Sequence, residues 1–116
     1  MKINIPILLN NKLIDINRNI FNINNIVYIS ILDLCNILQI NKSTDINYNN
    51  ETKYISINKN NNILLINDSM VLFNNINYSN NGCIKVGGIT YMPIKLIVEL
   101  YNGIYIENEN GIYIDL

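Results

Sequence analysis

The stretch at residues 25–31, NIVYISI, recurs later in the chain as residues 88–94, GITYMPI. Both copies are rich in β-branched and aromatic residues, which is typical of strands. Each copy runs directly into apolar residues spaced at i, i+3, i+4 and i+7, which predicts a helix with one buried face. We therefore predict a strand followed by a helix in each copy, with the helices over residues 32–39 and 95–102.

The residues at the expected helix ends support this prediction. Ser30 and Pro93 hold the same position before the two apolar stripes; Ser suits an N-cap, and Pro suits the first helical turn. Gly103 provides a stop for the second helix. Asp33 is the acidic residue of the first helical stretch, and we expect it on a solvated face.

The flanking sequence extends the repeat in both directions. Each helix precedes a short strand-like piece, a polar turn and a closing strand, at residues 46–57 and 104–116. At the front, residues 7–14 resemble residues 64–71, and each predicts two strands joined by a two-residue turn of Asn or Asp, which tolerate left-handed backbone. The predicted fold class is α+β. It consists of two diverged repeats, residues 1–58 and 63–116, each a small antiparallel sheet with one packed helix, which together form one compact domain.

The second copy resembles the copper amine oxidase N-terminal-like domain, or stalk domain, of low-GC Gram-positive bacteria and their phages. The resemblance rests on residues 86–95, VGGITYMPIK, and 99–103, ELYNG. The first copy departs from it, since Ser30 replaces the Pro, Leu32 replaces the basic residue, and no Gly follows the helix. The resemblance implies small helix-packed sheets and an accessory, non-enzymatic module of secreted or envelope proteins, which also occurs in clostridial phages.

A second resemblance points to a different function. Residues 27–38 are similar to the strand and helix that open phage antirepressor domains of the Bro type, which bind DNA. The charge balance argues against that function, because 8 Lys and Arg stand against 9 Asp and Glu, for a net charge of -1. Such a surface offers little attraction to a phosphate backbone, so we expect no nucleic-acid partner.

The composition is dominated by two residue types. The chain has 26 Asn and 26 Ile, which an AT-rich genome explains, and only 15% of its residues are charged. Asn fills surface positions that Lys and Glu usually occupy. Copies of such a weakly charged protein repel one another little, which favours self-association.

The residues needed for catalysis are largely missing from the sequence. The chain has no His, which removes the commonest general base and metal ligand. Cys35 and Cys83 have no metal or redox spacing, and we expect two buried or half-buried thiols unless the fold pairs them. Glu107, Glu109 and Asp115 lack the spacing of a calcium loop and predict an acidic hairpin turn. We predict a non-enzymatic protein with no catalytic residue, no cofactor and no metal site.

The eight tyrosines are the best candidates for a contact surface. Tyrosine combines a large apolar ring with a polar tip, and it is enriched in interfaces. Alternation along the closing hairpin predicts Tyr105 and Tyr113 on one face. The candidate contact surface comprises Tyr105, Tyr113, Tyr101 and Tyr54.

These observations leave three functions open. The first is a structural or assembly module that self-associates or docks on a phage, spore or cell-surface structure. The second is a small phage-encoded binder of a host protein or a small ligand, and the third is an antirepressor-like regulator. The sequence shows no signal peptide and no membrane span, which indicates the cytoplasm at synthesis and leaves release in a phage particle or on a spore surface open.

Overall fold

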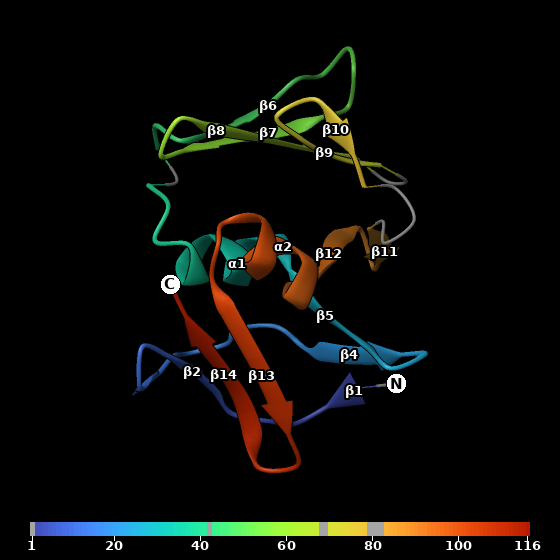
Figure 1. Cartoon of the computed structure of the whole chain (residues 1–116). Helices are drawn as coiled ribbons and strands as arrows, with labels where there is room; N and C mark the ends of the chain where they lie inside the picture. Colours follow the sequence, from blue (N-terminus) through green and yellow to red (C-terminus); the bar gives the residue numbers. More distant parts are fainter. Residues whose placement is uncertain (1, 42, 68–69, 79–82) are drawn as a thin grey trace.

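The computed structural model describes residues 2–41, 43–67, 70–78 and 83–116 (Figure 1). The described residues form short strands and two helices of seven residues each. In chain order the elements are β1 (Lys2–Ile3), β2 (Ile7–Leu9), β3 (Lys12–Leu13), β4 (Ile20–Ile23), β5 (Ile26–Ser30), α1 (Ile31–Ile37), β6 (Ile46–Tyr48), β7 (Ile55–Lys59), β8 (Asn62–Ile66), β9 (Val71–Phe73), β10 (Ile76–Asn77), β11 (Ile84–Val86), β12 (Ile89–Pro93), α2 (Ile94–Leu100), β13 (Ile104–Asn108) and β14 (Gly111–Asp115).

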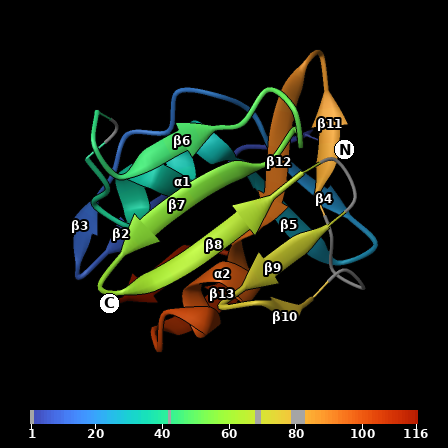
Figure 2. The ribbon, with the colours of Figure 1, turned by 90° about the horizontal axis from the view of Figure 1, so that it is seen from above.

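The strands form three sheets around the helices. Sheet A has the order β1-β4-β5-β12-β11, sheet B has β13-β14-β2-β3, and sheet C has β10-β9-β8-β7-β6. Figure 1 shows sheet C as a layer above the two helices and sheet B below them, while sheet A runs from beside the helices at β11 and β12 down to β4 and β1. Figure 2 looks down onto sheet C. The described chain is therefore mostly antiparallel sheet with two short helices, which agrees with the predicted α+β class.

The prediction that each half forms its own sheet is wrong. All three sheets combine strands from residues 1–58 with strands from residues 63–116. In sheet B, β14 near the end of the chain lies parallel to β2 near its beginning. The physical reason is size, because a few short strands and one seven-residue helix bury too little apolar surface to be stable alone.

The segments β4-β5-α1 and β11-β12-α2 have matching geometry. Each is a hairpin with a two-residue turn that runs directly into its helix. Between β5 and β12, Ile29 lies opposite Met92, while the flanking pairs join Tyr28 to Pro93 and Ser30 to Tyr91. Tyr28 and Tyr91 hold matching places in their segments, as do Ser30 and Pro93, so the pairing is symmetric about Ile29 and Met92.

The helix ends also match. Ser30 caps α1 by accepting the Asp33 N–H, as predicted, whereas Pro93 holds the same position before α2 without a side-chain cap. Gln39 after α1 and Asn102 after α2 both have positive φ, 56° and 60°. A left-handed residue at this place is a common helix stop. The left-handed stop of α2 is thus Asn102, one residue before the predicted Gly103, and both helices end two residues earlier than predicted.

Asparagine pairs form the tight turns between strands. Positive φ angles occur at Asn10–Asn11, Asn24–Asn25, Asn60–Asn61 and Asn74–Asn75, and Gly87–Gly88 supplies the equivalent turn before β12. The common type I′ form of a two-residue hairpin turn needs this left-handed backbone, which Asn adopts more readily than most residues. The turn predicted at residues 67–68 lies partly outside the described residues, and the Asn74–Asn75 turn joins β9 to β10. Eight of the 26 Asn residues therefore have a structural use in these turns.

Asp33 is buried, so its predicted position on a solvated face is wrong. It is 1% exposed and accepts hydrogen bonds from the backbone N–H groups of Asn17 and Arg18, at 3.0 and 3.2 Å. The Ser30 hydroxyl donates a third bond to it at 2.9 Å. Asp33 thereby holds the loop before β4 against the start of α1.

Candidate functional site

The outer face of sheet B carries a row of apolar side chains across all four strands. The pairing register places Ile106 opposite Tyr113, Tyr113 beside Leu8, and Leu8 opposite Leu13. Residues paired across a sheet point to the same face, so the four side chains share one surface. Ile106 is 55% exposed and Leu13 is 69% exposed, while Tyr113 and Leu8 are half-buried. We call these four residues the sheet B row.

The row reaches an open sheet edge at β13. This strand ends the order of sheet B, and its five residues pair with β14 on one side. The outer edge of such a strand presents unpaired backbone N–H and C=O groups. Proteins usually protect such edges with charged side chains, most often Lys, with Pro or with a bulge. Ile104–Asn108 contains neither Lys nor Pro and has one charged residue, Glu107. Ile104, 57% exposed, lies on the same face as Ile106.

The structure separates the four candidate tyrosines. Tyr105 lies opposite Ile114, which is buried, whereas Tyr113 lies opposite Ile106, so Tyr105 and Tyr113 face opposite sides and the prediction that they share a face is wrong. Tyr105 packs against the core, and its hydroxyl donates to Glu107 at 2.7 Å. The cause is the two-residue turn, which sets a register in which Tyr105 and Tyr113 cannot be partners.

The other two tyrosines lie elsewhere. Tyr54 precedes β7 in sheet C, and its hydroxyl donates to the Met70 sulfur at 3.2 Å. Tyr101 follows α2 and packs edge-on against Phe73, with ring centres 5.2 Å apart. Of the predicted contact residues, only Tyr113 belongs to the sheet B row. The predicted contact surface lacks Ile106, Leu8 and Leu13, although the alternation of Ile104 and Ile106 along β13 indicates the first of them.

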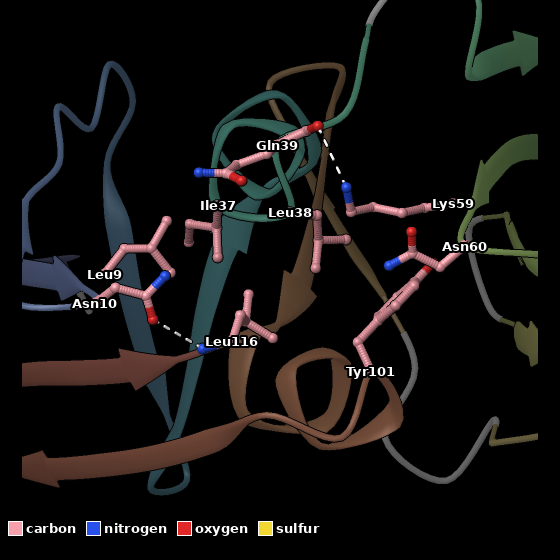
Figure 3. A pocket seen from close by; sticks show the side chains of 9 residues that line it. All are labelled: Leu9, Asn10, Ile37, Leu38, Gln39, Lys59, Asn60, Tyr101 and Leu116. Carbon is pink, nitrogen blue, oxygen red and sulfur yellow. Dashed lines mark hydrogen bonds between the residues drawn. The ribbon is translucent and has the colours of Figure 1, made fainter.

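A pocket of about 210 Å³ lies where the ends of both helices meet the ends of two hairpins (Figure 3). It is lined by Leu9, Asn10, Ile37, Leu38, Gln39, Lys59, Asn60, Tyr101 and Leu116. Leu38 and Tyr101 each stand directly after a helix, and Asn60 and Leu116 each directly follow a strand of a closing hairpin. Both halves of the chain therefore contribute to the pocket from matching positions.

Tyr101 lines this pocket, but its hydroxyl is closed to solvent. Its Oη is buried and has no hydrogen-bond partner. In Figure 3 the ring rises from the end of α2 toward Asn60. Burial, with a smaller contribution from Cys35, raises the pKa of Tyr101 to about 12. The phenol therefore stays protonated near neutral pH and keeps a hydrogen bond to donate.

Lys59 supplies the charge of the pocket. It is the one charged side chain among the nine lining residues. Its ammonium donates to the Gln39 carbonyl at 3.4 Å, a long bond that uses one of three donors. The pocket thus combines leucine and isoleucine side chains with one positive charge and with Asn and Gln amides, which both donate and accept hydrogen bonds.

Within residues 2–41, 43–67, 70–78 and 83–116, no three His, Cys, Asp or Glu side chains gather closely enough to hold a metal ion. Cys35 and Cys83 are both buried as thiols. In the same part of the chain, neither helix has the length and apolar character that a membrane span requires.

No protein-family model, curated protein or solved structure matches the chain. The resemblance to the stalk domain therefore stays a prediction.

Proposed function

We propose that the protein is a non-enzymatic structural module that self-associates through the open edge of sheet B. The observation that carries this proposal is that the sheet B row ends at β13, a five-residue edge strand without Lys or Pro. An apolar face that reaches an edge with a single charged residue favours pairing with another strand. The low charge of the chain adds little repulsion between copies.

The occupant we propose for this edge is β13 of a second copy, antiparallel and centred on Ile106. In that register Ile106 faces its own counterpart, and the two sheet B rows join into one apolar strip. Glu107 then lies opposite Tyr105 of the other copy, so the two carboxylates do not face each other. A register centred on Glu107 would place like charges directly opposite, which is unfavourable.

The fold supports a further part of this proposal, that the chain consists of two diverged copies of one α+β unit which exchange hairpins. The symmetric pairing about Ile29 and Met92 and the matching helix ends support it. In sheet B the closing hairpin β13-β14 lies against the opening hairpin β2-β3 of the other half. In sheet C the corresponding hairpins are β6-β7 and β9-β10. They lie on either side of β8, a strand that has no equivalent in sheet B. We propose that this stalk-like module is part of a phage, spore or cell-surface structure.

The test is the mass of the protein in solution, measured by light scattering after gel filtration at rising concentration. We expect dimers or larger species, well above the 13.4 kDa of one chain. Ile106→Lys should weaken association at least about tenfold, because two ammonium groups would face each other across the paired edges.

Ile63→Lys is the matched control, because Ile63 is 47% exposed on β8 of sheet C and lies away from β13. It should leave association unchanged. A monomer at every concentration would overturn the proposal, and so would equal effects of the two lysine variants.

A further inference from the structure

Pairing through the β13 edge leaves the outer face of sheet B uncovered. On this face Ile104, Ile106 and Leu13 are 57%, 55% and 69% exposed. In an edge-paired dimer the two sheet B rows join into one strip, with four side chains from each copy. Soluble proteins seldom leave a contiguous apolar patch of more than a few hundred Å² in contact with water. The joined strip therefore needs a partner that covers it.

We propose that the strip packs face to face against the strip of a second edge-paired dimer, so that four copies of the chain form a sandwich of two joined sheets. The sandwich rests on the proposed function, because the pairing of β13 creates the strip. Sheets stacked in this way lie about 10 Å apart, and the side chains of their inner faces interdigitate. The sheet B row of every copy thereby becomes buried.

The charge on this face favours a second copy over a charged partner. Six residues of β13 and β14 point to the outer side, namely Ile104, Ile106, Asn108, Gly111, Tyr113 and Asp115, and only the last is charged. Asp115 lies opposite Ile104 at the end of the strands, so its carboxylate stays at the rim of the sandwich, in contact with water. Two such faces meet without burying an unpaired charge, which would be costly. A strongly basic or acidic partner would find little complementary charge here.

The area of the face suits the stacking of two pairs rather than of two single copies. Strands lie about 4.8 Å apart and rise about 3.4 Å per residue, so sheet B, with four strands of up to five residues, covers about 330 Å². Two single copies would bury about 650 Å² in total, which is well below the roughly 1,200 Å² of a stable interface. Two edge-paired dimers would bury about 1,300 Å², which reaches that size. The pair is therefore the unit whose face is large enough to stack.

The shape of the face also suits a second sheet. It is hollowed beside the sheet B row by a cavity of about 260 Å³, whose lining includes Leu8, Ile104, Ile106 and Tyr113. Protein interfaces are packed about as densely as protein interiors, so a hollow of this size has to be filled in a stable assembly. Protruding side chains of the facing sheet can enter it, as the interdigitation of stacked sheets requires.

The experiment compares the mass of the full chain with that of Leu13→Lys, by light scattering after gel filtration at rising concentration. The parent should reach four copies, about 54 kDa as four times 13.4 kDa. Leu13 lies on β3, at the opposite edge of sheet B from β13, so its replacement leaves the paired edge intact. Leu13→Lys should therefore weaken the association of two pairs at least about tenfold and leave dimers, because four leucines lose their apolar cover and four ammonium groups enter the interface.

Leu32→Lys is the matched control. Leu32 is 40% exposed on α1, and Lys95 holds the same place in α2, so a lysine is compatible with this position. The variant should still form four copies. A parent that stops at two copies would overturn the sandwich, and dimers that persist in Leu13→Lys would then show that the edge pairing stands. A parent that stays monomeric would overturn both proposals, and four copies in Leu13→Lys would overturn stacking through this face.

Discussion

Replacing Asp33 by Ala is expected to lower the free energy of unfolding by about 3 kcal/mol. The carboxylate accepts three hydrogen bonds, from Ser30 and from the backbone of Asn17 and Arg18, while being almost fully buried. Alanine would leave the fully buried Ser30 hydroxyl without its acceptor and would release the loop before β4. The cost exceeds that of an ordinary hydrogen bond because buried donors stay unsatisfied.

Urea unfolding followed by circular dichroism measures this loss. Asp33→Asn keeps one oxygen acceptor and should recover about half of it. The control is Asp45→Ala, since Asp45 also accepts a backbone N–H, from Asn41 at 3.0 Å, but at an exposed site. Its expected cost is below about 1 kcal/mol, because water replaces the lost partner. Equal losses for Asp33→Ala and Asp45→Ala would show that the buried network does not stabilise the fold.

The second large effect is expected at Gly103, where α2 meets the last strand. A Cβ at this position would lie 2.9 Å from the Asp115 carbonyl oxygen and 2.8 Å from a methyl group of Val98. Such crowding cannot be relieved without moving β14 away from the helix, because one of the atoms is backbone. Gly103→Ala should therefore cost about 2 kcal/mol, even after the small gain from a less flexible unfolded chain.

Gly88→Ala is the control for this substitution. Gly88 has φ of 78° in an open turn, and a Cβ there would meet nothing within 4 Å. Its cost should be about 1 kcal/mol, from left-handed backbone alone. Thermal unfolding of the two variants separates the causes. A Gly103→Ala protein as stable as the parent would contradict the close approach of α2 and β14.

Local structure could be predicted because it depends on local chemistry. The apolar stripe that includes Leu34 and Cys35, with Ser30 before it, is enough to place α1 and its cap. Asn pairs between β-branched runs similarly predict tight turns. Both helices end two residues before their predicted ends, because the apolar spacing continues through Leu38 and Tyr101 after the helical backbone has stopped.

Contacts between distant segments could not be predicted in the same way. The pairing of β14 with β2 joins the two ends of the chain, and no property of Ile112 or Ile7 alone specifies that partner. The burial of Asp33 depends on backbone N–H groups more than ten residues away. The pocket could not be predicted for the same reason, since Lys59 and Tyr101 line it together only in the folded chain.

Cross-linking through a single introduced cysteine tests the proposed association most directly. In the β13 pairing centred on Ile106, Ile106→Cys would face its counterpart with Cα atoms about 4.5 to 5.5 Å apart, a separation that suits a disulfide. Cys35 and Cys83 are buried and should not compete. Mild oxidation of Ile106→Cys should give mostly covalent dimer, whereas Ile104→Cys, opposite Asn108 of the other copy, should give little. A monomer from Ile106→Cys, or equal dimer from both variants, would contradict association through this edge.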